Sequence, residues 1–269
     1  MDMRLDGLPV DDLLSVGHQL ADAARPATLR HFRRVGLTAD NKAGDHFDPV
    51  TAADRECEQA IRAALADLRP QDAVHGEEFA DRSGDSGLTW TIDPIDGTRG
   101  FLIGAPTWGV LIGLSDVQGP IMGVIDQPFT GERFIGGLGQ AAYQGPGGPR
   151  ALGTRATATL DAAILCSTYP EIGSPTEREA FRDVAGRVKL TRYGMDCYAY
   201  ALLAMGQLDV VIEAGLHAYD IVAPLAVVTA AGGVVTDWRG GPAHDGGRVV
   251  AAANPTLHAA ALDILRAAP

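Results

Sequence analysis

The sequence is poor in cysteine, in aromatic residues and in positive charge. Its three cysteines, Cys57, Cys166 and Cys197, are scattered and have no metal-ligand spacing. We expect them to be small core residues of a protein in a reducing compartment. Lys and Arg number 22 against 34 Asp and Glu, so the formal net charge is −12. This balance argues against a broad surface for nucleic acid or anionic lipid.

Long apolar runs and polar low-complexity segments are also lacking. The longest weakly apolar run, Ile221 to Val235, contains Pro224 and Gly232-Gly233 and is too short to span a bilayer. The first residues show no basic-then-apolar signal pattern. Hydrophobic residues make up 46% of 269, enough for a substantial core. We predict a cytoplasmic protein with neither a membrane nor a nucleic-acid partner.

The first half has the pattern of an antiparallel sheet flanked by two helices. Helical spacing covers residues 9 to 35 and about Thr51 to Leu68, with Thr51 as a cap. Short β-like runs separated by turn residues then follow, at Leu88–Asp93, Trp108–Leu114, Ile121–Asp126 and Glu132–Gly136. We predict an α+β unit over residues 1–145 that carries most of the candidate metal ligands.

The second half alternates between strand and helix patterns. It follows the Gly- and Pro-rich segment Gln144 to Arg150, which has the composition of an exposed turn or a boundary. Strands are expected at Ala162–Ser167, Leu208–Glu213, Gly233–Asp237 and Val249–Ala253, and helices at Thr176–Val188, Cys197–Met205, Asp220–Ala231 and Pro255–Ala267. We predict a second, α/β unit over residues 146–269.

One acidic segment is the strongest functional signal. The apolar run Leu88 to Ile92 carries Asp93 to the end of a predicted strand, where Pro94 is expected to stop the sheet pairing. Asp96 follows three positions later, and Gly97-Thr98 open a segment with the features of a helix start. Hard oxygen ligands favour Mg²⁺, Mn²⁺ or Ca²⁺ over zinc, and helix-start amides suit a phosphate. The segment therefore predicts a metal-dependent phosphatase.

Each motif also has a plain structural interpretation. An isolated Asp-Pro-x-Asp-Gly is commonly a turn, and Gly76-Glu77-Glu78 alone is typical of a solvated loop. Together, Glu77, Asp93 and Asp96 form one candidate metal site. A fourth carboxylate from the second half would allow two cations roughly 3.5–4 Å apart. Local sequence suggests no Ser/His or Cys/His pair, so we expect a metal-activated water as the nucleophile.

The motifs in order resemble the inositol monophosphatase family of Mg²⁺-dependent phosphatases. The resemblance runs from about Lys42 to Gly233 and rests on Asp48-Pro-Val-Thr-Ala-Ala-Asp54, Gly76-Glu77-Glu78, Asp93-Pro-Ile-Asp-Gly-Thr98 with Phe101, and Tyr219-Asp220. It implies a layered αβαβα sandwich of the α/β (α+β) class, assembled as a homodimer. It also implies two or three Mg²⁺ per site, with Mn²⁺ as a substitute.

The resemblance further assigns roles to individual residues. Cations would be bound by the side chains or carbonyls of Glu77, Asp93, Ile95, Asp96 and Asp220. Gly97 and Thr98 would bind the phosphate through their amides, Thr98 and Glu77 would align the attacking water, and Asp54 would support Thr98. Three positions depart from the family pattern: Tyr219 stands for a Trp, Gly100 for a small polar residue, and Lys42 is shifted by one position.

Two further acids bear on the substrate. Asp196 stands where inositol-type members have small residues, and Glu213 matches a substrate-facing acid. An extra carboxylate disfavours a second phosphate and favours a cationic substrate group. The flanking runs resemble inositol-monophosphatase-type histidinol-phosphatases, so we predict hydrolysis of histidinol phosphate in histidine biosynthesis. Asp196 has a plainer interpretation as the cap of a helix at Cys197, and we expect His217 to be a loop residue rather than a ligand.

Other functions remain open on sequence grounds. Within the family, the alternatives are an inositol-1-monophosphatase, a fructose-1,6-bisphosphatase and a 3′-phosphoadenosine nucleotidase. A haloacid-dehalogenase-type phosphatase would use its first Asp as a covalent nucleophile, but its two acids are two positions apart rather than three. A non-catalytic metal-dependent binding module is the third class, and the intact acidic set argues against it.

Overall fold

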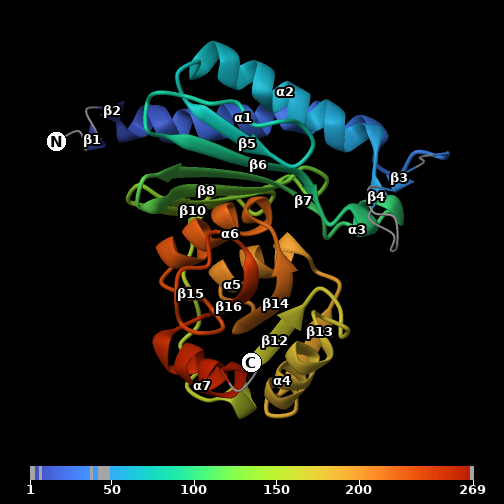
Figure 1. Ribbon diagram of the computed structural model, residues 1–269, viewed down its shortest axis with the longest axis vertical. Helices are drawn as coiled ribbons and strands as arrows, with labels where there is room; N and C mark the ends of the chain where they lie inside the picture. Colours follow the sequence, from blue (N-terminus) through green and yellow to red (C-terminus); the bar gives the residue numbers. More distant parts are fainter. Residues whose placement is uncertain (1–3, 6–7, 37–38, 42–48, 267–269) are drawn as a thin grey trace.

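Five layers of secondary structure alternate between helix and sheet from one end of the molecule to the other (Figure 1). The computed structural model describes residues 4–5, 8–36, 39–41 and 49–266. Two helices form the outer layer, a seven-stranded sheet the second, two helices the third, a five-stranded sheet the fourth and two helices the last. The predicted αβαβα sandwich is confirmed.

The outer helices of the first layer are α1 (Val10–His31) and α2 (Ala52–Leu68). Apolar side chains at helical spacing, such as Leu13 and Leu20 on α1 and Ile61 and Leu65 on α2, are buried against the first sheet and one another. Thr51 caps α2 through a reciprocal capping box with Asp54, as the sequence predicts. Short antiparallel pairs join β1 (Arg4–Leu5) to β2 (Leu8–Pro9) and β3 (Asp40–Asn41) to β4 (Pro49–Val50).

The first sheet is the predicted meander, with one parallel strand added at its edge. Its order is β11-β10-β9-β8-β7-β6-β5, and only the β5–β6 pair is parallel. The strands are β5 (Ala73–Gly76), β6 (Thr89–Asp96), β7 (Gly109–Asp116), β8 (Gly119–Gln127), β9 (Glu132–Gly137), β10 (Gln140–Gln144) and β11 (Arg150–Ala151). The Gly- and Pro-rich segment is the turn between β10 and β11, so this sheet extends slightly past residue 145.

A row of glycines lets helix α6 (Ala218–Ala230) lie directly on the first sheet. Gly113, Gly123 and Gly136 are paired side by side across β7, β8 and β9. A Cβ atom on Gly123 would lie 2.1 Å from the carbonyl oxygen of Ala223, and one on Gly136 would lie 2.5 Å from the Cα of Val227. Only glycine allows this approach, and it brings the start of α6 to the end of β6.

The second sheet has the order β13-β12-β14-β16-β15 and is mixed. Its strands are β12 (Ile164–Ser167), β13 (Leu190–Tyr193), β14 (Val210–Leu216), β15 (Val234–Asp237) and β16 (Gly247–Ala252). Along β14, Val211 faces the core shared with the middle helices, whereas Val210 and Ile212 face the core beneath the last layer. The helices of this half are η1 (Leu160–Ala162), α4 (Pro175–Ala185), α5 (Cys197–Ala204), α6 and α7 (Pro255–Leu265).

Candidate active site

A β-bulge in β6 creates the geometry of the acidic segment. Asp93 pairs with Leu111 and Asp96 pairs with Gly109, so two residues of β6 lie opposite one of β7. The prediction that Pro94 ends the sheet pairing is wrong, because the bulge places the proline off the ladder and pairing resumes at Asp96. The side-chain oxygen of Asp93 accepts a hydrogen bond from the Ile95 N–H at 3.0 Å. The bulge thereby redirects the strand between the two acids.

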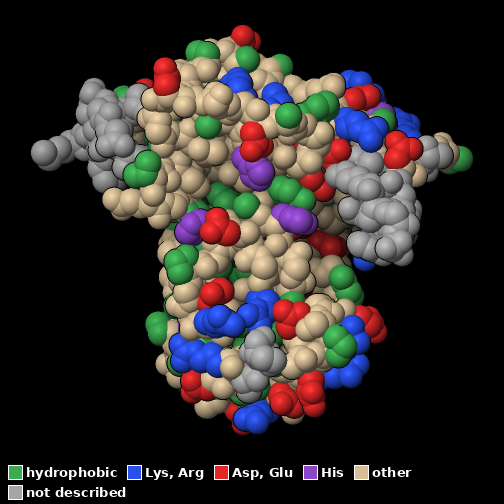
Figure 2. Space-filling view, viewed as in Figure 1, with side chains coloured by type: hydrophobic (Ala, Val, Ile, Leu, Met, Phe, Trp, Pro, Cys, Tyr) green, Lys and Arg blue, Asp and Glu red, His purple; other side chains and the backbone are tan. Residues whose placement is uncertain are grey.

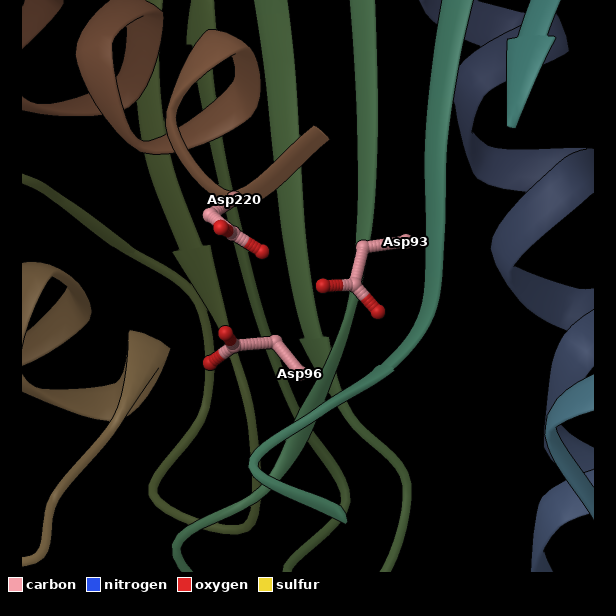
Figure 3. A group of neighbouring side chains, drawn as sticks. All are labelled: Asp93, Asp96 and Asp220. Atoms are coloured by element: carbon pink, nitrogen blue, oxygen red, sulfur yellow. The ribbon is translucent and has the colours of Figure 1, made fainter. Parts of the chain in front are cut away.

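Three carboxylates from two distant parts of the chain meet beside this bulge. In the part of the chain that the structure describes, Asp93, Asp96 and Asp220 offer oxygen atoms that all lie within 4.8 Å of one another. Figure 3 shows the side chains of Asp93 and Asp96, from β6, and of Asp220, from the first turn of α6, pointing toward a common space. The glycine row beneath α6 is what makes this approach possible.

Backbone donors fix the orientation of two of these acids. The N–H of Cys197, at the start of α5, donates to Asp96 at 2.5 Å. The N–H of His217 donates to Asp220 at 2.6 Å. Each acid is therefore held by the first turn of a middle-layer helix, where the positive end of the helix dipole favours a carboxylate.

The electrostatics of the cluster fit a cation. Burial, reinforced by the charges of Glu77, Asp96 and Asp220, raises the pKa of Asp93 well above its usual range. Burial together with Asp196 and Asp220 likewise raises the pKa of Asp96, although the hydrogen bond from Cys197 opposes this. Clustered, desolvated carboxylates repel one another in the ionised state. A hard divalent cation coordinated by these oxygens would remove that repulsion.

A cavity of about 330 Å³ opens over the carboxylates. It is lined by all the predicted metal ligands, both predicted phosphate-binding residues and Asp196, together with further side chains: Glu77, Asp93, Ile95, Asp96, Gly97, Thr98, Arg99, Thr168, Tyr169, Asp196, Gly215, His217, Tyr219 and Asp220. The structure thus brings these predicted residues to one place. The volume suits a small metabolite.

The predicted phosphate-binding turn borders this cavity. Gly97 has φ = 87°, which favours glycine, and it precedes the short helix α3 (Thr98–Leu102). The hydroxyl of Thr98 lies 3.1 Å from the Ile95 carbonyl and 3.4 Å from Asp54, and its one proton is donated to either of these oxygens. Asp54 also accepts from the N–H and the hydroxyl of Thr51. The predicted contact between Asp54 and Thr98 is present in the structure.

Asp196 lies against the phosphate-binding turn. A Cβ atom on Gly97 would be only 3.1 Å from the Cβ and Cγ of Asp196. Asp196 occupies the N-cap position of α5, but its side chain makes no capping hydrogen bond to the described residues. Its backbone has φ = 46° and ψ = −139°, a conformation that costs about 1–3 kcal/mol and that occurs mainly at functional sites. Burial raises the pKa of Asp196 to about 6, against the opposing effect of Arg99.

Glu213 lies behind the cavity wall. Its carboxylate accepts hydrogen bonds from the N–H of Thr168 at 2.7 Å, the Thr168 hydroxyl at 3.0 Å and the Ser167 hydroxyl at 3.3 Å. Burial raises the pKa of Glu213 to about 8 although these donors act in the opposite direction. Thr168 lines the cavity and Glu213 does not figure among its described lining residues. Direct substrate contact by Glu213 stays a prediction.

Several lining residues were not singled out from the sequence. Thr168 and Tyr169 belong to no motif, and Arg99 entered only through the run Asp-Gly-Thr-Arg-x-Phe, which resembles that of histidinol-phosphatases. These residues reach the cavity from α3 and from the segment that follows β12. His217 was expected to be a loop residue, and it lies just before α6 with its ring stacked on Tyr219 at 5.0 Å. The motif residues Lys42 and Asp48 lie outside the described residues.

Comparison with known proteins identifies the family. A sequence profile described as the inositol monophosphatase family matches residues 10–269. The chain belongs to the inositol monophosphatase family. It is 38% identical over 239 residues to the bifunctional phosphatase IMPL2 of Arabidopsis thaliana, covering 88% of this chain and 67% of that protein. The histidinol-phosphatase of Streptomyces coelicolor is 34% identical over 254 residues, with 92% and 94% covered.

Solved structures agree with this family assignment. An inositol monophosphatase from Zymomonas mobilis superposes with a TM-score of 0.84 at 36% identity, covering 95% of this chain and 98% of that one. As a member of the inositol monophosphatase family, the protein is a phosphoric monoester hydrolase, as predicted from the acidic motifs. Each helix in the part of the chain that the structure describes is too short or too polar to span a bilayer.

Proposed function

We propose that the protein is a Mg²⁺-dependent histidinol-phosphatase that converts L-histidinol phosphate to L-histidinol in histidine biosynthesis. The observation that supports this substrate is the side chain of Asp196, which lies against Gly97 in the same cavity as the metal-binding acids. A carboxylate so close to the phosphate-binding turn repels a second phosphate and attracts an ammonium or imidazolium group. Histidinol phosphate carries an ammonium and a titratable imidazole.

The metal ligands in this proposal are Glu77, Asp93, Asp96, Asp220 and the carbonyl of Ile95, all of which line the cavity. Bound there, Mg²⁺ would neutralise the charge of the phosphate and lower the pKa of a bound water. Mn²⁺ offers similar coordination and is the expected substitute. The deeply buried Asp93, which is 2% exposed, would otherwise keep an uncompensated charge in the interior.

The remaining residues position the phosphate and the water. The amides of Gly97 and Thr98, at the start of α3, would donate to the phosphate oxygens. Because the Thr98 hydroxyl donates to Asp54 or Ile95, its lone pairs are available to accept a hydrogen bond from the attacking water. Glu77 would accept the water's other proton as general base. The proton would move to the Glu77 carboxylate as the water oxygen attacks phosphorus in line with the leaving oxygen. The bond from phosphorus to that oxygen breaks, and the departing alkoxide takes up a proton from solvent water to give the alcohol.

Inositol 1-phosphate is the second candidate substrate. The 36% identity to the Zymomonas mobilis inositol monophosphatase favours it, as does Arg99, which counteracts the charge of Asp196.

On the face shown in Figure 2, Lys, Arg, Asp and Glu side chains are interspersed over the lower lobe. That distribution suits a small substrate held inside a cavity better than a polyanion held on the surface.

A phosphate-release panel tests the proposal. It covers histidinol phosphate, inositol 1-phosphate, fructose 1,6-bisphosphate and adenosine 3′,5′-bisphosphate, each with Mg²⁺ and with EDTA. We expect histidinol phosphate to give the highest kcat/KM and EDTA to abolish turnover of all substrates. Faster turnover of inositol 1-phosphate would overturn the substrate assignment.

Asp196→Asn is the matched variant for this panel, because Asn tolerates a positive φ and keeps the shape of Asp. Loss of the charge should lower kcat/KM for histidinol phosphate about tenfold or more, equivalent to about 1.4 kcal/mol. The value for inositol 1-phosphate should stay unchanged or rise. Equal losses on both substrates would show that Asp196 supports the turn rather than selecting the substrate.

A further inference from the structure

Helix α2 carries a buried ion pair that none of the sequence motifs includes. The Glu58 side chain is fully buried, and its Oε1 accepts a hydrogen bond from Nε of Arg62 at 2.7 Å. A buried carboxylate is costly unless its oxygens are satisfied. Glu58 therefore needs a structural or functional reason to be in the core.

The partners of this pair lie in the loop that carries Glu77. The second oxygen of Glu58 accepts a hydrogen bond from the N–H of Glu78 at 2.7 Å. Nη2 of Arg62 donates to the carbonyl of Phe79 at 3.1 Å. The loop begins where β5 ends, so these contacts hold its backbone just after Glu77.

The same ion pair also lies against Gly76, the residue that precedes Glu77. A Cβ atom on Gly76 would lie 2.1 Å from Oε1 of Glu58 and 2.9 Å from a guanidinium nitrogen of Arg62. The glycine of the Gly-Glu-Glu motif thus lets the loop pack onto the ion pair. Glu77 therefore lies between Gly76, which packs against Glu58, and Glu78, whose N–H donates to Glu58.

The same face of α2 also reaches the phosphate-binding turn. Asp54, Glu58 and Arg62 follow one another at intervals of four, so they project from one side of the helix. Asp54 contacts Thr98, and Cys57 donates from its thiol to the Pro94 carbonyl at 3.4 Å. One rigid helix therefore contacts the Glu77 loop, the β6 bulge and the Thr98 turn.

We propose that Glu58 and Arg62 are positioning residues, which hold Glu77 at the distance from Asp93 and Thr98 that the metal site requires. This inference rests on the proposed function, in which Glu77 is a metal ligand and the general base. Groups that orient a metal ligand through hydrogen bonds typically contribute 10- to 100-fold in metal affinity or activity. Neither Glu58 nor Arg62 is among the described residues that line the cavity, so both act through the loop that carries Glu77.

The test combines two readouts on the full chain. Mg²⁺ binding is measured by calorimetry without substrate, and the Mg²⁺ dependence of phosphate release from histidinol phosphate is measured well below the melting temperature. The variants are Arg62→Met, Arg62→Lys and Glu58→Gln. Glu56→Gln is the control, because Glu56 lies on the same helix and pairs with Arg30 on the outer surface.

We expect Arg62→Met to weaken Mg²⁺ binding and to raise the half-saturating Mg²⁺ concentration about 10- to 100-fold. KM for the substrate at saturating Mg²⁺ should stay within about twofold, because the pair does not line the cavity. Arg62→Lys should recover part of the loss, since an ammonium can still reach Glu58. Glu58→Gln should resemble Arg62→Met, and the Glu56→Gln control should resemble the wild type.

Wild-type Mg²⁺ affinity in both Arg62→Met and Glu58→Gln would overturn the inference, even if their melting temperatures fall, because the pair would then be purely structural. Failure of the proposed function looks different. In that case the wild-type protein itself would show neither Mg²⁺ binding at the site nor Mg²⁺-dependent phosphate release.

Discussion

At the scale of one residue, the burial of Asp93 lowers the stability of the folded protein at the candidate metal site. The side chain is 2% exposed and is surrounded by other carboxylates, which together with burial raise its pKa. Burying this carboxyl in the metal-free protein costs free energy, because it must either lose the solvation of its charge or take up a proton. A divalent cation bound by Asp93, as we propose, would offset this cost.

Replacing Asp93 with Asn should therefore separate activity from stability. Asn keeps the shape and can still accept the hydrogen bond from Ile95. We expect Mg²⁺-dependent phosphatase activity to fall at least 100-fold, whereas the melting temperature in EDTA should rise by a few degrees. Each kcal/mol corresponds to about 2–4 °C in a chain of this size.

Thermal denaturation in EDTA and phosphate release with Mg²⁺ provide the two measurements. Asp67→Asn is the control, since Asp67 is exposed on the outside of α2. If Asp93→Asn kept wild-type activity with Mg²⁺ and its melting temperature in EDTA did not rise, the assignment of Asp93 as a ligand would be contradicted.

Glu213 predicts a pH dependence of stability. Its pKa of about 8 in the folded protein lies above the ordinary value of 4.5, so the folded state retains a proton that the unfolded chain releases. The contribution of Glu213 to the free energy of unfolding is fully present below its unfolded pKa and is lost as the pH rises to about 8. From pH 6 to pH 8 the loss should be on the order of 2 kcal/mol. Glu213→Gln should remove it.

Urea denaturation of the two proteins in EDTA at pH 6 and pH 8 measures the difference. The other buried acids titrate in both proteins, so the comparison isolates Glu213. If the free energy of unfolding changed by the same amount from pH 6 to pH 8 in the wild type and in Glu213→Gln, Glu213 would already be ionised in the folded protein at pH 6.

The sequence allowed some of these residues to be predicted and not others. Asp93, Asp96 and Thr98 lie in one short segment whose turn and cap chemistry can be recognised locally. Glu58 could not be found in the same way. It sits within the apolar stripe of α2, and its partner loop is 20 residues away. A buried pair with long-range partners has no local signature.

At the scale of elements, the contact of α6 with the first sheet places Asp220. The sequence predicted the helix itself, but the position at which the helix packs on the sheet depends on which glycines lie side by side. Gly113, Gly123 and Gly136 become neighbours only through the strand register. Turn composition likewise could not show that β6 continues past Pro94 through a bulge, because the bulge is defined by pairing with β7.

Adding one methyl group to the glycine row should disturb both fold and site. In Gly123→Ala the new Cβ would clash with the backbone of Ala223, which α6 can relieve only by moving away from the sheet. We expect a loss of about 1–3 kcal/mol in the free energy of unfolding. Activity should fall as well, because the shift displaces Asp220.

Urea denaturation and phosphate release again provide the readouts. Gly147→Ala is the matched control, since a Cβ atom at position 147 meets nothing within 4 Å. If Gly123→Ala matched this control in both stability and activity, α6 would not need the close approach that we describe.

At the scale of the whole molecule, the candidate active site lies between the two sheets. Asp93 and Asp96 come from the first sheet, Asp220 from the middle layer, and Thr168 follows a strand of the second sheet. Periodicity and turn signals predicted the two sheets and most of the elements, whereas the layered arrangement was implied by the resemblance to the family. They gave no information on β13 or on the parallel pairing of β5, because short strands without clear alternation resemble loops. Division at residue 145, a cytoplasmic location and a homodimer stay predictions.

The central claim is that acids from separate parts of the chain form one divalent-metal centre. Crystals soaked in Mn²⁺ and measured for anomalous scattering test it most directly, because Mn²⁺ is located independently of any assumed ligand. We predict anomalous peaks between Asp93, Asp96 and Asp220, with Glu77 in contact. Peaks only elsewhere, or none at this cluster at millimolar Mn²⁺, would contradict the claim.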